Sequence, residues 1–578
     1  MNCKDDNKIS KLKKKRNWIL HEIRNASIKA RNNKLDKLVE DVDERSSDGG
    51  MFKAVKLLNK RSNEKLKVED EEGKLTTNPD EVLKITTDFF KEKFRQEGTQ
   101  DIKPYEGNPR PLQRQITREE IRNSLNRLSN GKAPGEDDIN GELLKYAPPI
   151  LDKKLAQMIN KLFQNHEDVN INNGLMITIP KPGKQKGPVK NLRPITLLTT
   201  IRKTLSTIVL QRIRPKVEEY LSHSQSGFRP NRSTSDIVWM HKWLAAKVNL
   251  TKLEIKITGI DMSAAFDTIR RDVLLQVLEG IIENDELRII RFLLSNTKIN
   301  IRIDGSSSKI PFTSNIGTPQ GDSLSPILFI VYLEHALREV RKKRNTPITE
   351  IETSLPNEAV YADDIDFIGI DHIDITQVQD ILKEYNLMVN VDKTELTNLN
   401  RKDDRWKDVK KVGSLIGDKE DIARRKRLSQ NALNKMTHLW NRSDKIKLKT
   451  KLKLYNTLVK SILLYNSATW ALTKTDEDKL DAFHRKQLRK MLGIHYPVKI
   501  TNDSLYKKCN ESPVSIQILE ARWKLFGHIL RRNPAIPANK AMHFYFTATS
   551  SEKYRGRPIT TLPVTLNNDL KKDQRKQD

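Results

Sequence analysis

Three aspartates stand at the ends of short apolar runs, where a β-sheet would present polar side chains at its edge. Asp261 closes the run LEIKITGI at 253–260, whose alternating isoleucines are typical of a strand. Asp363 and Asp364 lie between the two apolar runs of EAVYADDIDFIGI, a pattern typical of a β-hairpin. Carboxylates this close repel one another, and divalent cations bound between them relieve the repulsion. The three aspartates therefore predict a site for Mg²⁺, with Mn²⁺ as a substitute.

Such a site has a specific chemistry. Two Mg²⁺ ions about 4 Å apart can bind a primer 3′-hydroxyl and a nucleoside triphosphate, lower the pKa of the hydroxyl and stabilise the leaving pyrophosphate. The reaction is nucleotidyl transfer. An adjacent aspartate pair is weak evidence for a metal site on its own, because in a highly charged protein such a pair more often lies in an exposed turn. The flanking apolar runs and the third aspartate favour the metal site.

The aspartate segments resemble the catalytic motifs of reverse transcriptases. YADD at 361–364 and DMSAAFD at 261–267 are similar to the two aspartate motifs of that family. The resemblance implies that Asp261, Asp363 and Asp364 are both the catalytic residues and the metal ligands.

Two further motifs follow the pattern of the same family. GTPQGDSLSPILF at 317–329 resembles the motif between the aspartate motifs, which implies that Gln320 and Gly321 pass close to nucleotide and template. LMVNVDKTEL at 387–396 resembles a later motif, and Lys393 matches its lysine. That lysine is a candidate general acid for protonating pyrophosphate. An ordinary surface lysine of a hairpin is the open alternative for Lys393.

The resemblance also implies contacts to the incoming nucleotide. The segment at 179–198, IPKPGKQKGPVKNLRPITLL, resembles the fingers hairpin, in which Lys181 and Arg193 would contact the triphosphate. A guanidinium pairs with phosphate oxygens through two bonds, and an ammonium adds a mobile point charge. Phe266 falls where the family places a ring under the sugar, which would exclude a 2′-hydroxyl. Without the motif, Phe266 would be interpreted as a core residue.

Other segments narrow the resemblance to one branch of the family. The stretch at 224–239 carries Arg229 and Arg232, which we expect to contact backbone phosphates. Residues 406–436 resemble the primer grip and thumb entry of LINE-like, non-LTR retrotransposons. The resemblance implies an RNA-directed DNA polymerase that binds an RNA template, a DNA primer or target DNA, and dNTPs.

Two alternatives remain open from the sequence. A group II intron maturase shares the polymerase core, but the thumb and C-terminal segments here look LINE-like. A catalytically silent, nucleic-acid-binding remnant of such an element is the second alternative. The three intact aspartates argue against it, although damaged fingers or a missing partner domain would also silence the enzyme.

The expected fold is an α+β right-hand polymerase whose palm is an antiparallel sheet backed by helices. We expect four regions along the chain. They are a basic helical N-terminal region and linker at 1–110, fingers and palm at 111–420, a helical thumb at 421–500, and a basic C-terminal region at 501–578.

Local signals predict several boundaries within these regions. Thr117 and Glu120 form a capping box at the start of a helix that ends at Gly131. We expect Ser325 to cap a second helix and Thr475 to cap a third. The stretch from 60 to 110 is polar and interrupted by glycine and proline, which predicts a linker.

The charge of the chain points to a polyphosphate partner. Lysine and arginine number 105 against 75 acidic residues, a net charge of +30. The alternative is a merely well-solvated surface. Residues 1–34 form a basic arm, and KISKLKKKR within it is a hypothetical nuclear localisation signal.

The remaining composition bears on compartment. Cys3 and Cys509 are too few for a disulfide framework or a zinc knuckle. The N-terminus lacks the apolar core of a secretory leader, and the longest apolar run, 327–333, is too short to cross a membrane. We expect no membrane role and an intracellular location, in nucleus and cytoplasm.

Overall fold

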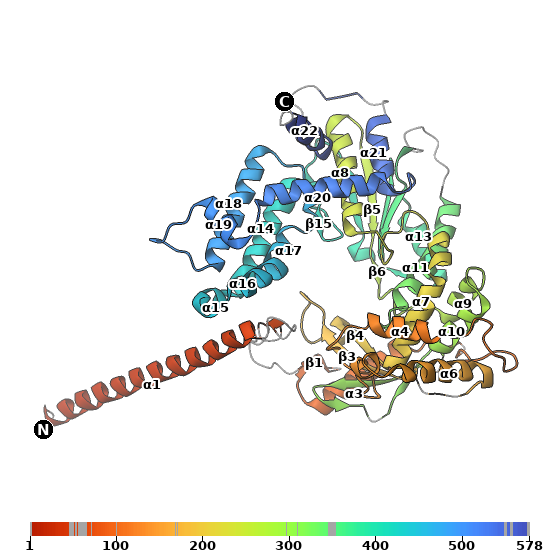
Figure 1. The fold of residues 1–578 in the computed structure, drawn as a ribbon, viewed down its shortest axis with the longest axis horizontal. Helices are drawn as coiled ribbons and strands as arrows, with labels where there is room; N and C mark the ends of the chain where they lie inside the picture. The colour runs from red at the N-terminus through yellow and green to blue at the C-terminus, as the bar shows by residue number, and fades with distance from the viewer. Residues whose placement is uncertain are drawn as a thin grey trace. The chain divides into compact units, whose positions relative to one another are not determined.

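The chain divides into two compact units (Figure 1). The sheet unit holds Lys65–Asp403 and Arg532–Tyr554, and the helical unit holds Met1–Glu64, Asp404–Arg531 and Arg555–Asp578. The division between the units thus falls after residue 403. The sequence predicted that the thumb would begin at residue 421. The computed structural model describes residues 3–44, 51, 52, 55, 66–70, 72–99, 101–167, 169, 171–295, 297–308, 310–344, 354–547, 552–554 and 559–574.

A four-stranded antiparallel sheet lies inside the sheet unit. Its order is β10 (Glu358–Tyr361), β11 (Asp364–Gly369), β5 (Ile255–Ile260) and β13 (Glu395–Leu399). Helix α8 (Thr234–Leu250) packs against β10 and β13. Side chains such as Ile257, Ile365 and Phe367 are buried, as their alternation along the strands requires. The predicted antiparallel sheet backed by helices is confirmed.

A second sheet carries the hairpin that the sequence predicted at 179–198. β3 (Gly174–Pro180) and β4 (Leu192–Leu198) pair antiparallel, and β3 also pairs with β7 (Thr297–Ile303) in parallel. The short strands β8 (Ser306–Ser307) and β9 (Phe312–Ser314) flank β7. The chain between Pro180 and Leu192 forms the tip of the hairpin.

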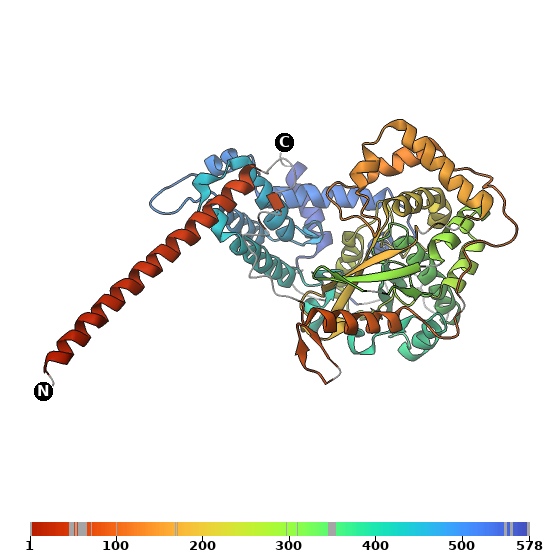
Figure 2. The ribbon, with the colours of Figure 1, turned by 90° about the horizontal axis from the view of Figure 1, so that it is seen from below.

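Helix α3 (Pro79–Lys93) lies alongside this second sheet and corrects the prediction of a linker at 60–110 (Figure 2). Asn78 caps the helix and Pro79 opens it. Val82 and Phe90 are buried in one core with Met176 of β3. Turn residues on both sides hid this helix, although Val82, Thr86 and Phe90 recur every four residues.

The capping predictions had mixed outcomes. The capping box of Thr117 and Glu120 is confirmed and opens α4 (Arg118–Arg127). Ser325 is not a cap: α11 (Ser325–Lys343) begins with it, and its hydroxyl donates to the carbonyl of Pro319 at 2.9 Å.

The third predicted cap was misplaced by two residues. Helix α18 (Lys474–Met491) is capped by Thr473, because Asp476 three residues later completes a capping box. Thr475 lies inside the helix. Leu480, Leu488 and Met491 are buried, and Phe483 is half-buried.

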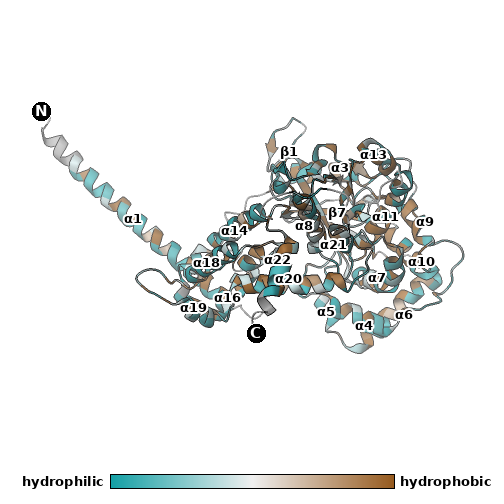
Figure 3. Cartoon of the chain, turned by 90° about the horizontal axis from the view of Figure 1, so that it is seen from above, coloured by the Kyte–Doolittle hydropathy of each residue, from teal (hydrophilic) through white to brown (hydrophobic). Residues whose placement is uncertain are grey.

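The helical unit combines both ends of the chain. Its helices include α14 (Asp418–Lys435), α16 (Leu448–Tyr455), α18, α19 (Asn502–Cys509), α20 (Val514–Leu530) and α22 (Leu562–Gln574). The last part of α1 (Cys3–Glu44) joins this core, where Val39 and Val42 pack with Trp440. Residues 10–34 of α1 are exposed and largely hydrophilic (Figure 3). No helix in the described ranges is both long and apolar enough to span a membrane.

Candidate active site

Strand pairing brings the three aspartates to one edge of the antiparallel sheet. Ile260, the last residue of β5, pairs with Ile365 of β11. Asp261 comes directly after Ile260 and Asp364 directly before Ile365, so the two aspartates lie at the same end of neighbouring antiparallel strands. Asp363 lies in the turn between β10 and β11. The predicted hairpin is confirmed, and the register across β5 and β11 unites residues that are a hundred positions apart in sequence.

The electrostatics of this edge distinguish the carboxylates. Burial raises the pKa of Asp363, and the negative charge of Asp261 raises it further, whereas Lys393 opposes the shift. The ammonium of Lys393 lies 2.6 Å from a carboxylate oxygen of Asp261. The backbone N–H of Asn390 also donates to the carbonyl of Asp261 at 2.8 Å. The segment that carries Lys393 is therefore tied to the aspartate edge.

The donor chemistry of the three aspartates suits a hard divalent cation. They offer only carboxylate oxygens, which Mg²⁺ and Mn²⁺ accept. A cation would also offset the repulsion that raises the pKa of Asp363. Within the described ranges, however, no three His, Cys, Asp or Glu side chains are gathered closely enough to hold an ion. Asp261 faces Lys393 instead.

The turn that carries Asp363 is supported by a loop at 224–227. Ser226 and Ser224 exchange backbone hydrogen bonds with Val360 of β10. The side-chain oxygen of Gln225 accepts from the backbone N–H of Ala362 at 3.1 Å and from that of Gly227 at 2.7 Å. In the sequence, the arginines of this segment stand out, and no local pattern signals the role of Gln225.

Gly227 is required for the close approach of this loop to the turn. A Cβ atom added there would lie 2.3 Å from the backbone nitrogen of Ala362. The expected phosphate contact of nearby Arg229 is wrong, because its guanidinium is buried and bonded to Glu218 and to the carbonyl of Ser222. Arg232 is only partly buried and donates to the carbonyl of His223.

The sequence left two interpretations of Phe266, a ring under the sugar or a core residue, and the structure shows features of both. Its ring stacks on Phe329 with centroids 4.4 Å apart and meets Phe228 edge to face at 6.0 Å. It is nevertheless half-buried rather than buried, so part of the ring remains accessible. Its position five residues after Asp261 keeps the proposed contact with a sugar open.

Gln320 is fixed from two sides. Its side-chain amide donates to Asp267 at 2.7 Å, and its carbonyl accepts from the backbone N–H of Thr196 in β4 at 2.7 Å. Gly321 approaches the same strand, since an added Cβ would lie 2.4 Å from the carbonyl oxygen of Thr196. The close contact between the two backbones therefore requires a glycine at this position.

The fingers hairpin adds positive charge. Lys181 and Arg193 both lie at its tip end, where Arg193 pairs with Ile179 and is exposed. Burial lowers the pKa of Lys181, and the neighbouring cations Lys93, Arg193 and Lys393 add to the effect. Lys93, on α3, was missed by the sequence analysis because its segment was interpreted as a linker.

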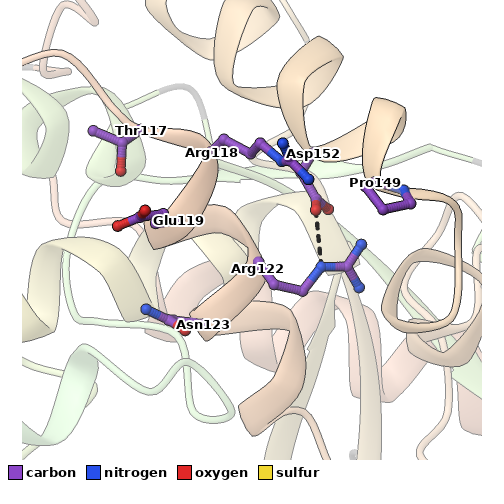
Figure 4. A pocket seen from close by; sticks show the side chains of 7 residues that line it. All are labelled: Thr117, Arg118, Glu119, Arg122, Asn123, Pro149 and Asp152. Atoms are coloured by element: carbon purple, nitrogen blue, oxygen red, sulfur yellow. Dashed lines mark hydrogen bonds and ion pairs between the residues drawn. The ribbon is translucent and has the colours of Figure 1, made fainter.

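A separate pocket lies on the outer helices of the sheet unit (Figure 4). It is formed by α4 and α6 (Pro149–Asn165), and Arg122 crosses it to bond Asp152 at 2.8 Å. It contains none of the predicted site residues. Its lining consists of Thr117, Arg118, Glu119, Arg122, Asn123, Pro149 and Asp152.

Comparison with known protein families identifies the class of protein to which this site is similar. Residues 179–443 match the family described as reverse transcriptase (RNA-dependent DNA polymerase). The match includes all three aspartates, the four strands of the antiparallel sheet and Lys393. Together with the antiparallel sheet, it confirms the α+β right-hand polymerase class.

The relatives specify the branch. Within the family match, the relatives of this chain are polymerases and Pol polyproteins of mobile elements. It is 25% identical over 414 residues to the RNA-directed DNA polymerase from mobile element jockey of Drosophila funebris, covering 65% of this chain and 44% of that protein. It is 26% identical over 254 residues to the Pol polyprotein of the type-1 retrotransposable element R2 of Popillia japonica, covering 44% of this chain and 34% of that protein. The chain thus spans less than half the length of these relatives.

Among solved structures, the apo telomerase of Candida tropicalis matches 73% of this chain and 72% of its own length. The TM-score is 0.36 and the sequence identity is 14%.

Proposed function

We propose that this chain is an RNA-directed DNA polymerase that adds dNTPs to a primer 3′-hydroxyl under the direction of an RNA template. The observation that carries the proposal is the strand pairing that places Asp261, Asp363 and Asp364 at the same end of the antiparallel sheet, inside the reverse transcriptase match. The name of the jockey relative, an RNA-directed DNA polymerase, supports the choice of an RNA template.

The aspartates are proposed to hold two Mg²⁺ ions, with Mn²⁺ as a substitute. When bound, the ions would activate the primer hydroxyl and stabilise the charge of the triphosphate and the leaving pyrophosphate. Lys393 is assigned the return of a proton to pyrophosphate. Its bond to one carboxylate oxygen of Asp261 keeps it beside the reacting groups.

The surrounding side chains are proposed to bind the nucleotide. Lys181 and Arg193 supply positive charge for the triphosphate, and the electrostatic interaction of Lys181 with Arg193 and Lys393 supports this role. The accessible part of the Phe266 ring would lie under the sugar and select dNTPs. Gln320 and Gly321 would form the surface on which the nucleotide and template base meet.

The division of labour along the chain is also a proposal. Fingers and palm would span 111–420, a helical thumb 421–500, and basic regions 1–110 and 501–578 would add nucleic-acid contacts. The net charge of +30 supports binding of a template and of a DNA primer or target DNA. Such a function is consistent with a place in nucleus and cytoplasm.

Primer extension on poly(rA)/oligo(dT) with dTTP and Mg²⁺ tests the proposal. We expect the purified chain to extend the primer, to stop when EDTA removes the cation, and to extend when Mn²⁺ replaces Mg²⁺. A chain that binds the hybrid but extends neither this primer nor a DNA-templated one would instead be the silent, nucleic-acid-binding remnant.

A further inference from the structure

Lys93, which lies 86 residues before the reverse transcriptase match, reaches the proposed active site. Its ammonium lies 2.7 Å from a carboxylate oxygen of Asp267, one residue after Phe266. The other carboxylate oxygen of Asp267 accepts the amide of Gln320 at 2.7 Å. Lys93, Asp267 and Gln320 therefore form one continuous relay, which we call the Lys93 relay.

The relay is held on rigid supports. Lys93 is the last residue of α3, and both Phe90 of the helix and Phe94, which follows the helix, lie in the core beneath the second sheet. The ammonium sits 5.9 Å from the ring of Phe90 and 5.7 Å from that of Phe94, where cation–π attraction favours it. The helix terminus therefore fixes the place of the charge.

Asp267 depends on this charge because its side chain is only 3% exposed. A buried carboxylate is costly unless it is paired and hydrogen-bonded. Lys93 supplies the pairing and Gln320 the second bond. Removing the ammonium would leave a buried carboxylate with one neutral partner, and a movement of the Asp267 side chain that relieved this cost would displace the amide of Gln320.

The relay also settles the orientation of that amide. An ionised carboxylate only accepts hydrogen bonds, so the NH₂ group of Gln320 must face Asp267. The carbonyl oxygen of the amide is then the atom directed away from Asp267. The backbone of Gln320 is fixed independently by Thr196, so the relay decides only how the side chain is presented.

We propose that Lys93 is a positioning residue for the incoming deoxynucleoside triphosphate, acting through Asp267 to present the side chain of Gln320. The inference rests on the proposed polymerase function. It makes α3 part of the nucleotide site, although α3 lies outside the matched family segment. Lys93 also lies within electrostatic range of Lys181, so its charge adds to the cationic side of the site.

The test compares Lys93→Met and Lys93→Arg with Lys91→Met in the full chain. Lys91 is exposed on the same helix and serves as the matched control. On poly(rA)/oligo(dT), we expect Lys93→Met to raise the KM for dTTP about tenfold, because a misplaced Gln320 side chain would lose the equivalent of one hydrogen bond to the nucleotide. The change in kcat should be smaller, Lys93→Arg should recover most of the affinity, and Lys91→Met should match the wild type.

A binding measurement separates this inference from the polymerase function. Equilibrium binding of dTTP to the chain on its primer–template is measured with Ca²⁺ in place of Mg²⁺, with the melting temperature of each variant. A wild type that extends primers and a folded Lys93→Met with unchanged KM and unchanged dTTP affinity would overturn the relay alone. A wild type that neither extends a primer nor binds dTTP would overturn both proposals.

Discussion

Gln225 holds the turn that carries Asp363, because its side-chain oxygen accepts the backbone N–H of Ala362 at 3.1 Å. Ala362 has a φ of +58°, a left-handed conformation that costs a non-glycine residue on the order of 1 kcal/mol. Gln225 is 2% exposed and belongs to a loop that pairs with β10. The strained turn is therefore stabilised from outside the hairpin.

The substitution Gln225→Leu should show whether Gln225 supports the turn that carries Asp363 or only stabilises the fold. The buried N–H groups of Ala362 and Gly227 would lose their acceptor, at a cost of about 1–3 kcal/mol each. We expect a melting temperature lower by several degrees, a kcat lower by about tenfold, and a higher Mg²⁺ concentration at half-maximal extension. If the melting temperature falls but the Mg²⁺ dependence stays that of the wild type, Gln225 supports the fold and not the aspartates.

Gly227→Ala should act on the same turn by steric contact. The added methyl group would meet the backbone nitrogen of Ala362 at 2.3 Å, so the turn or the loop must move. We expect primer extension to fall by about a hundredfold or more, while binding of the RNA–DNA hybrid is retained. Gly280→Ala is the control, because its nearest contact would be an ordinary 3.8 Å. Full extension by Gly227→Ala would show that the turn tolerates displacement.

Phe266→Val tests the proposed selection of the sugar. A smaller side chain would admit a 2′-hydroxyl, so the ratio of kcat/KM for rUTP to that for dTTP should rise about tenfold. The ratio within one variant cancels the loss of stacking on Phe329. An unchanged ratio would mean that another group excludes ribonucleotides and that Phe266 is a packing residue.

His484 in the helical unit should make stability depend on pH. Burial lowers the pKa of its imidazole to about 4 from the ordinary 6.5, and neither ring nitrogen has a hydrogen-bond partner among the described residues. Between these values the unfolded chain binds a proton that the folded chain does not, so the free energy of unfolding falls as the pH falls. The loss should reach about 3 kcal/mol at pH 4.

Melting curves recorded from neutral pH down to about pH 4 check this prediction. His484→Phe should flatten the dependence, because a phenyl ring fits between Tyr455 and Tyr506 without a titrating group. His438→Gln, at an exposed position, should leave the dependence as it is in the wild type. Equal slopes for the wild type and His484→Phe would contradict the assignment.

Local sequence patterns were enough to predict the aspartates at the end of the sheet. The residues that support these aspartates could not be predicted, because they act through contacts between distant parts of the sequence. The hairpin at Asp363 and the capping box at Thr117 each depend on residues close in sequence. Gln225 lies 137 residues from Ala362, and Lys93 lies 174 residues from Asp267. No periodicity connects such pairs.

Arg271 illustrates the same limit. It is fully buried and bonds the carbonyls of Leu294, Ser314, Ile316 and Gly317, which fixes the chain leading to Gln320. In the sequence it is one more arginine of a basic protein. The missed helix α3 has a related cause, since glycine and proline on both sides obscured the buried face that positions Lys93.

The most direct test of the central claim is primer extension by Asp363→Asn, measured with hybrid binding on the same poly(rA)/oligo(dT) substrate. Asp380→Asn, at an exposed position of α13 (Ile375–Glu384), is the matched control. We predict that Asp363→Asn binds the hybrid like the wild type and extends it at least about a thousandfold more slowly, whereas Asp380→Asn extends normally. Extension by Asp363→Asn at the wild-type rate would contradict the assignment of this edge as the polymerase active site.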